Sequence, residues 1–240
     1  SELIKIAVKS LGLDELGKFK PEERIIEYLL KDNADSKLVR MSLHAFADET
    51  ASESPAPGGG SISAYMGALG AALATMVANL SSHKRGWDDR WEEFSNWAEK
   101  GQKFQSELIR LVDEDTKSFN MIMSAFGLPK ANDEEKAIRT KAIQDATRYA
   151  TEIPFKVMEA ALGSMEVIKI MSEIGNPNSV SDAGVGALAA RSAVMGAFLN
   201  VKINAAGLTD KAFAGDITSR GKALQDKAIA GLERHPAGGG

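Results

Sequence analysis

The sequence predicts an all-α fold, a multi-helix up-and-down bundle. Three observations favour this class. From about Ser36 onward, apolar residues recur at steps of three and four, the spacing of one face of a helix. Alanine is abundant and long alternating β-branched runs are absent, and stretches rich in glycine and proline separate the periodic segments. A chain of 240 residues, 44% of them apolar, is long enough to bury a full core.

The first helical segments lie on either side of an unusual turn. Residues 1–35 contain glycine breaks and a polar stretch, so we expect a linker-like appendage there. Ser42 can cap a helix over residues 43–51. Two prolines and three glycines then fill residues 55–60, and Ser61 suits the cap of the next helix. Small residues along that helix favour close approach by its neighbours.

Four further helices follow. A long amphipathic helix is expected over residues 87–126, where its apolar stripe consists of Trp87, Trp91, Phe94, Ala98, Phe104, Leu108, Val112, Phe119, Ile122 and Phe126. Asn132 and Glu135 form a capping-box pattern for the next helix, which Pro154 kinks or restarts. The turn-forming residues 175–182 precede a helix over 183–204, and Thr209 or Asp210 caps the last. Residues 235–240 are expected to be a disordered tail, so the helical domain covers 36–234.

Composition excludes several classes of function. A net charge of -4, without a basic stripe, argues against nucleic-acid binding. The chain has no cysteine and only three scattered histidines, so we expect no metal site. Charged residues interrupt the early apolar positions where a signal peptide would need them. Residues 62–80 approach the length of a membrane span, but a buried helix is favoured, and the cytoplasm is the expected location.

Asp115 is the main catalytic candidate. With residues placed at about 100° per step from Leu108, Asp115 falls at roughly -20°, inside the apolar stripe, whereas Asp113 and Glu114 point away from it. Burial raises the pKa of a carboxyl, and an acid that keeps its proton near neutral pH suits general acid–base catalysis. The alternative is a structural aspartate bonded to a backbone amide or to an arginine.

Residues from two glycine-rich junctions are candidates for substrate binding. Gly58, Gly59, Gly60 and Ser61 open a helix whose backbone N–H groups can hold an anion, or they form a sharp structural turn. Asp182 can cap its helix or accept hydrogen bonds from a ligand. On the same helix, Arg191 can pair with a buried carboxylate or with one from a ligand. Asn204 shares a face with Asn200, without a clear purpose.

Taken together, these motifs resemble a known family. The ordered set is 55–61 (PAPGGGS), 111–119 (LVDEDTKSF), 128–130 (LPK), Ser181-Asp182 and 196–204 (GAFLNVKIN). It is similar to the cyclodeaminase domain of formiminotransferase–cyclodeaminase, whose relatives include methenyltetrahydrofolate cyclohydrolases. The resemblance runs from about Lys37 to Leu232, and residues 1–35 look like the linker from a preceding formiminotransferase domain.

The resemblance implies an activity and an assembly. It implies an obligate homodimer with a folate site in a cleft near the dimer interface, and an acid at the Asp115 position that donates the proton. The implied reaction converts 5-formiminotetrahydrofolate to 5,10-methenyltetrahydrofolate and ammonia, with no cofactor beyond the folate substrate, which can carry a polyglutamate tail. Two alternatives stay open: a methenyltetrahydrofolate cyclohydrolase, and a non-catalytic helical dimerisation module of a folate enzyme.

Overall fold

The computed structural model describes residues 8–13 and 38–233. The chain divides into two compact units, residues 1–37 and 38–240. In the first unit, residues 8–10 are helical and 11–13 form a turn. Most of the predicted linker, residues 1–35, and the whole predicted tail, residues 235–240, lie outside the described residues.

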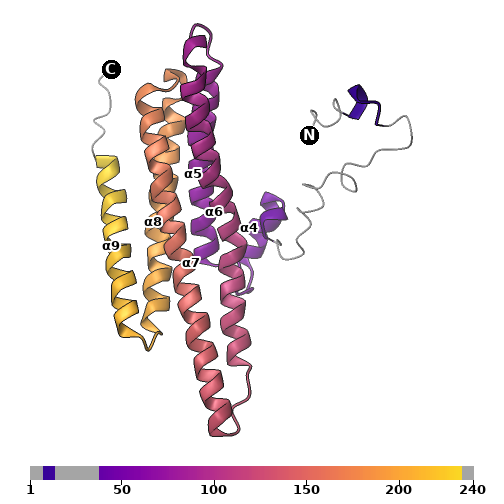
Figure 1. The fold of residues 1–240 in the computed structure, drawn as a ribbon, viewed down its shortest axis with the longest axis vertical. Helices are drawn as coiled ribbons and strands as arrows, with labels where there is room; N and C mark the ends of the chain where they lie inside the picture. The colour runs from indigo at the N-terminus through magenta and orange to yellow at the C-terminus, as the bar shows by residue number, and fades with distance from the viewer. Residues whose placement is uncertain (1–7, 14–37, 234–240) are drawn as a thin grey trace. The chain divides into compact units, whose positions relative to one another are not determined.

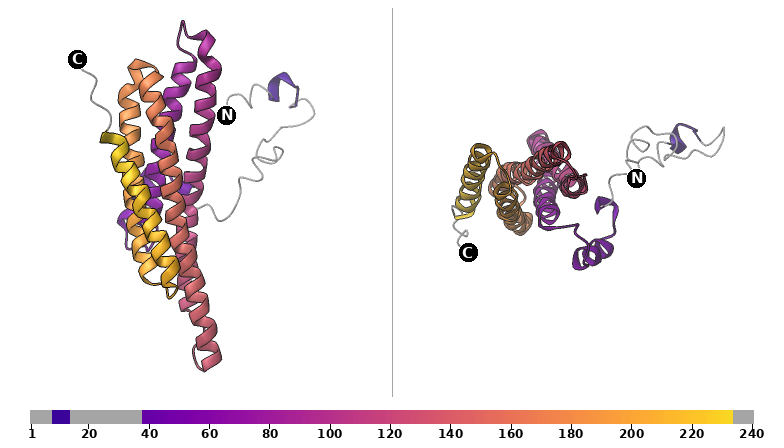
Figure 2. Two further views of the ribbon diagram at one scale, coloured as in Figure 1. Left: turned by 60° about the vertical axis from the view of Figure 1, so that its left-hand side comes forward. Right: turned by 90° about the horizontal axis from the view of Figure 1, so that it is seen from below.

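The second unit is a bundle of antiparallel helices (Figure 1). Its core consists of α5 (Gly59–Ser82), α6 (Trp91–Phe126), α7 (Asp133–Ile174) and α8 (Val180–Ala206), each packed against its neighbours. The last helix, α9 (Lys211–Glu233), packs outside this core against α7 and α8 (Figure 2). The described residues contain helices and no strand, so the predicted all-α bundle is confirmed.

Short segments connect the long helices. The 3-10 turn η1 (Leu38–Arg40) and α4 (Leu43–Ala51) precede α5, while η2 (Asp88–Arg90) and η3 (Pro177–Ser179) precede α6 and α8. The predicted caps at Ser42, Asn132 and Asp210 are confirmed, since each side chain accepts the backbone N–H three residues later. Helix α7 continues through Pro154 as one helix of 42 residues.

Helices α5 and α8 approach each other closely through glycine. A Cβ built on Gly70 would lie 2.8 Å from the carbonyl oxygen of Gly186 and 3.0 Å from the backbone nitrogen of Ala190. Gly186 faces Gly70 in the same way, with 3.1 Å to its carbonyl oxygen. The expected use of small residues in this helix is therefore confirmed, because neither backbone leaves space for a side chain between them.

We expect Gly70→Ala to destabilise the protein by about 1–3 kcal/mol, because the two helices must move apart to accept the methyl group. The alanine gains roughly 0.5–1 kcal/mol in helix propensity, which is too little to compensate. The matched control is Gly215→Ala in α9, where a Cβ meets nothing within 4 Å, and this variant should be more stable than the parent. Urea unfolding at one protein concentration checks both, and a Gly70→Ala protein as stable as the parent contradicts this packing argument.

The predicted helix over 87–126 starts too early, and two residues of its predicted apolar stripe, Trp91 and Phe126, lie outside the core, whereas Trp87 packs against the core and stacks on Phe94. The helix begins at Trp91, not at residue 87, and the side chains of Trp91 and Phe126 are 58% and 50% exposed. Helix α5 begins at the level of Asp115, so it does not cover the following turns of α6. There α6 and α7 project together as a hairpin (Figure 1), in which Arg139 donates to the carbonyl oxygen of Phe126.

Among the residues that the structure describes, two segments are long and apolar enough to cross a membrane by length and composition alone. They are α5 and residues 177–206, which include α8. In the bundle, 56% of the apolar window of α5 and 44% of the window in 177–206 are buried against other helices. Core helices of soluble bundles pass the same test, so these segments are weak indications of a membrane protein.

Candidate active site

The first turn of α5 begins without a side-chain cap. The helix begins at Gly59, and its N-cap is Gly58, which has no side chain to accept an amide hydrogen bond. The prediction that Ser61 caps this helix is wrong, because Ser61 is already its third residue and is fully buried. The first N–H groups of any helix lack intrahelical acceptors. These groups of α5 are therefore open to an acceptor from another part of the molecule.

Asp115 of α6 supplies that acceptor. The hydroxyl of Ser61 donates to Oδ2 of Asp115 over 2.9 Å, and the backbone N–H of Ser61 also bonds to this carboxyl group. The carboxyl lies directly against Gly60, where an added Cβ would be only 2.6 Å from Oδ2 and would overlap Oδ1. The missing side chain of Gly60 thus creates the space that Asp115 occupies.

Burial raises the pKa of the Asp115 carboxyl, and the two hydrogen bonds from Ser61 oppose this effect. Burial dominates because it disfavours the charged form of a carboxyl more than two hydrogen bonds favour it. The side chain is only partly buried, so a ligand can still reach it. Both interpretations made from the sequence have support: the carboxyl does bond to a backbone amide, and its pKa is nevertheless raised. A carboxyl whose pKa is raised by burial is better able to hold and donate a proton than an exposed one.

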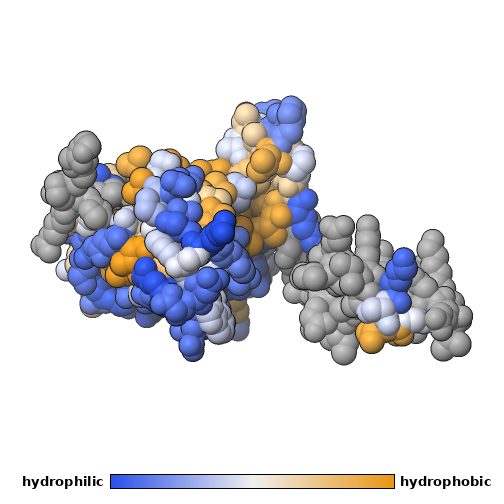
Figure 3. All heavy atoms as spheres, turned by 90° about the horizontal axis from the view of Figure 1, so that it is seen from above, coloured by the Kyte–Doolittle hydropathy of each residue, from blue (hydrophilic) through white to orange (hydrophobic). Residues whose placement is uncertain are grey.

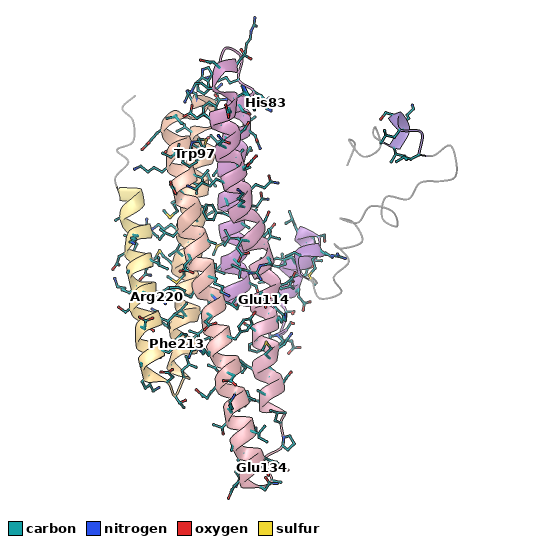
Figure 4. All side chains as sticks on the ribbon, in the orientation of Figure 1. His83, Trp97, Glu114, Glu134, Phe213 and Arg220 are labelled. Atoms are coloured by element: carbon teal, nitrogen blue, oxygen red, sulfur yellow. The ribbon has the colours of Figure 1, made fainter. Side chains whose placement is uncertain are left out.

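The two neighbouring acids face other elements. Asp113 accepts the backbone N–H of Leu38 over 2.9 Å and so holds η1 against α6. Glu114 accepts the phenol hydrogen of Tyr149 on α7, and burial together with this hydrogen bond raises the pKa of Tyr149 to about 12. In Figure 4, Glu114 lies between His83 at one end of the bundle and Glu134 at the tip of the α6–α7 hairpin. Of the three acids, only Asp115 faces the start of α5.

The structure places Asn200, which the sequence did not single out as a site residue, next to the same turn. A Cβ on Gly59 would lie 3.3 Å from Nδ2 of Asn200, which donates to the carbonyl oxygen of Gly196. The signal in the sequence was the pair of amides, Asn200 and Asn204, on one face of a largely apolar helix. Thr116 was also missed, although its hydroxyl lies 3.3 Å from that of Ser61. Only the packing of α6 against α5 reveals this contact.

The other predicted site residues lie elsewhere on α8. Asn204 donates to the carbonyl oxygen of Ala150 over 2.7 Å and thereby joins α8 to α7. Asp182 is not a cap, since α8 begins at Val180 with Ser179 as its N-cap. At 1.5 Å per residue, Arg191 and Asp182 lie roughly 14 and 27 Å along the helix from Asn200. A single chain therefore does not bring these two side chains to Asp115.

Away from Asp115, the described residues offer no metal site, and a groove on α6 is not a deep pocket. Within residues 8–13 and 38–233, no three histidine, aspartate or glutamate side chains are grouped closely enough to hold a metal ion. An open groove is lined by Glu99, Gln102, Lys103, Ser106, Glu107 and Arg110. All six residues belong to α6, so the groove is a surface depression of one helix and does not include Asp115.

Comparison with known proteins decides the family. Residues 42–223 match the model of the formiminotransferase-cyclodeaminase family, and residues 1–31 match that of the formiminotransferase domain. The chain belongs to the formiminotransferase-cyclodeaminase family. The family match begins at the cap of α4 and ends within α9, so it includes Asp115, Ser61 and the glycine turn.

Relatives named for two different activities are similar to this chain. The rat formimidoyltransferase-cyclodeaminase is 38% identical over 211 residues, which are 88% of this chain but only 39% of the rat protein. A methenyltetrahydrofolate cyclohydrolase of Methylorubrum extorquens is 39% identical over 173 residues, 72% of this chain and 83% of that protein. The crystal structure of formiminotetrahydrofolate cyclodeaminase from Thermotoga maritima superposes with a TM-score of 0.72 at 26% identity, covering 82% of this chain and 95% of that one.

Proposed function

We propose that this chain is a formiminotetrahydrofolate cyclodeaminase that uses Asp115 as its proton donor and acceptor. The observation that carries the proposal is the position of Asp115, a partly buried carboxyl with a raised pKa, fixed against the first turn of α5. The family relationship supplies the substrate class, since the Methylorubrum extorquens and Thermotoga maritima relatives are named for folate substrates.

One carboxyl can serve both halves of this reaction. Nitrogen N10 of the folate attacks the carbon of the protonated formimino group, and a new N10–C bond forms while the C=NH2⁺ bond becomes a single C–NH2 bond. The ionised Asp115 takes the proton that N10 sheds. The protonated Asp115 then gives that proton to the amino group, the C–N bond breaks, and ammonia leaves as the N5–C–N10 methenyl bridge forms. Each positioned proton transfer contributes about 10²–10⁴-fold, and holding N10 against the carbon supplies the rest.

The remaining predicted contacts differ in their support. Gly58, Gly59 and Gly60 belong to the same turn as Ser61, which donates to Asp115 of α6, so we propose that this turn lines the substrate site. Asn204 is engaged with α7, and Asp182 and Arg191 lie further along α8, so their contact with substrate stays a prediction.

The cyclohydrolase alternative differs from the deaminase in its substrate and products. A cyclodeaminase releases ammonia from 5-formiminotetrahydrofolate and produces methenyltetrahydrofolate, whereas a cyclohydrolase consumes methenyltetrahydrofolate with water and gives the 10-formyl form. The match of residues 1–31 to the formiminotransferase domain favours the deaminase, because the substrate of a deaminase is a folate that carries a formimino group. Measuring ammonia and methenyl absorbance with both substrates tests the proposal. Turnover of the methenyl compound alone contradicts it, and failure to bind any reduced folate in calorimetry indicates the non-catalytic module.

We also propose that the protein is a homodimer that associates through α8. Five apolar residues lie on one exposed face of this helix: Val185, Leu188, Met195, Leu199 and Ile203, 37–73% exposed. Leu69 and Met76 are further exposed apolar residues on α5, which packs beside α8. Hydrophobic residues gather along one side of the bundle in Figure 3. A contiguous apolar surface of this kind marks an interface.

We expect Leu199→Glu to convert the dimer to a monomer, because a carboxylate placed in an apolar interface loses its hydration without gaining a partner. The control Ala223→Glu adds the same charge to an exposed position of α9 and should leave the dimer intact. Light scattering coupled to size exclusion measures both masses. A dimeric Leu199→Glu protein, or a monomeric parent, contradicts the proposed interface.

Four further expectations from the sequence stay predictions. They are a cytoplasmic location, the lack of a cofactor, a polyglutamate tail on the substrate and a formiminotransferase partner domain.

A further inference from the structure

We propose that Thr116 and Ser61 form a positioning pair that holds Asp115 in both of its protonation states. This inference rests on the proposed function, because only an acid that alternates with its base form needs such a pair. The three groups form a chain: Oδ2 of Asp115 lies 2.9 Å from Oγ of Ser61, which lies 3.3 Å from Oγ1 of Thr116.

Hydroxyl groups suit both forms of the carboxyl because each can donate or accept. When Asp115 is ionised, Thr116 donates to Ser61 and Ser61 donates to Oδ2. When a proton is on Oδ2, the chain can reverse, so that Asp115 donates to Ser61 and Ser61 donates to Thr116. An ammonium or guanidinium partner can donate but cannot accept, so it favours the ionised form and pushes the pKa of the carboxyl down. The geometry of the second contact allows either hydroxyl to be the donor.

The surroundings leave this pair as the main polar influence on Asp115. From α5 the carboxyl meets Gly60 and Ser61, and the adjacent part of α8 contributes the neutral amide of Asn200 at Gly59. On α6 itself, Asp113 bonds to η1, and Glu114 bonds to Tyr149 of α7 with Arg110 and Lys117 within 4 Å. Ser61 is fully buried and its hydroxyl is held between the two α6 side chains, so its position is fixed.

The inference predicts an ordered set of pKa changes. Ser61→Ala removes the donor to the ionised carboxyl, so it should raise the pKa of Asp115. Thr116→Val keeps the side chain's volume but removes the hydroxyl that strengthens donation by Ser61, so it should raise the pKa by less. The double variant should match Ser61→Ala, because Thr116 acts only through Ser61. Thr116→Ser keeps the hydroxyl and should restore the parent value.

Carbon-13 NMR of the aspartate carboxyls measures this pKa in the free, folded protein, with the Asp115 signal identified by its absence from Asp115→Asn. The acidic limb of the kcat profile should move with it, and kcat of Ser61→Ala should fall about 10-fold or more. The control Thr147→Val removes a hydroxyl that bonds within α7 and should change neither value. The pairing is overturned if Thr116→Val changes the pKa of Asp115 by the same amount in the parent and in the Ser61→Ala variant. It is also overturned if Thr116→Val does not change this pKa in the parent. These NMR results remain interpretable even if Asp115 proves dispensable for ammonia release.

Discussion

Asp115→Asn is expected to lower kcat for ammonia release by about 10²–10⁴-fold while the protein stays folded. The amide is nearly the same size as the carboxyl and can still accept hydrogen bonds from Ser61, so the first turn of α5 keeps its acceptor. What it cannot do is take a proton from N10 or return one to the leaving amine. Ammonia release and methenyl absorbance, measured together, give the loss. Activity near that of the parent eliminates Asp115 as the proton carrier.

The stability of the same variant provides an independent check. Because the pKa of Asp115 is raised on folding, the stability associated with its protonated form is complete below the unfolded pKa. That stability is lost as the pH rises through the folded pKa, where the buried carboxyl ionises. Asp115→Asn does not ionise, so at neutral pH it should be at least as stable as the parent, and the difference should shrink as the pH falls towards about 4. A variant that is less stable at neutral pH shows that the carboxyl mainly holds the fold.

Gly60→Ala is expected to lower kcat by about 100-fold without unfolding the protein. The new Cβ would lie 2.5 Å from Cγ of Asp115, whereas non-bonded carbon atoms prefer about 3.5–4.0 Å, so the carboxyl must move by about 1 Å. A misplacement of this size can reduce a rate about 100-fold when the reaction depends on alignment. Helix propensity favours alanine, so the helix itself gains from the change.

Gly215→Ala is again the matched control, since the same change in open space on α9 should leave kcat at the parent value. Thermal unfolding followed by circular dichroism should show that both variants remain folded. A Gly60→Ala protein with full activity means that the position of the Asp115 carboxyl is not critical. A crystal structure of the variant should show that carboxyl displaced from Ser61.

The bundle could be predicted from the sequence because its causes are local. Helical periodicity, the cap residues and the glycine and proline breaks act within a few positions of one another, and they located the helices closely. The inward direction of Asp115 also follows from one helix alone. The role of Ser61 could not be predicted in this way, because a buried serine in the first turn and an N-cap serine have the same local sequence.

What the sequence lacked was the register between helices. The contacts of Thr116 with Ser61 and of Asn200 with Gly59 depend on which turn of α5 faces α6 and α8. The same missing information made the stripe of α6 too long, since Phe126 has helical spacing but lies beyond the start of α5. Arg191 and Asp182 share a helix with Asn200, yet the rise along α8 separates them from it.

The start of α5, which has no side-chain cap, links the order of its first turn to the position of the Asp115 carboxyl. A helix that opens with two glycines frays easily, and here one carboxyl from α6 holds its first turn in place. Fraying of that single turn would release Asp115 from Ser61, so that the carboxyl is no longer held in position, while the rest of the bundle stays intact. If Asp115 carries the proton as proposed, activity depends on the opening equilibrium of a few residues, and warming should abolish turnover well below the melting temperature of the whole bundle.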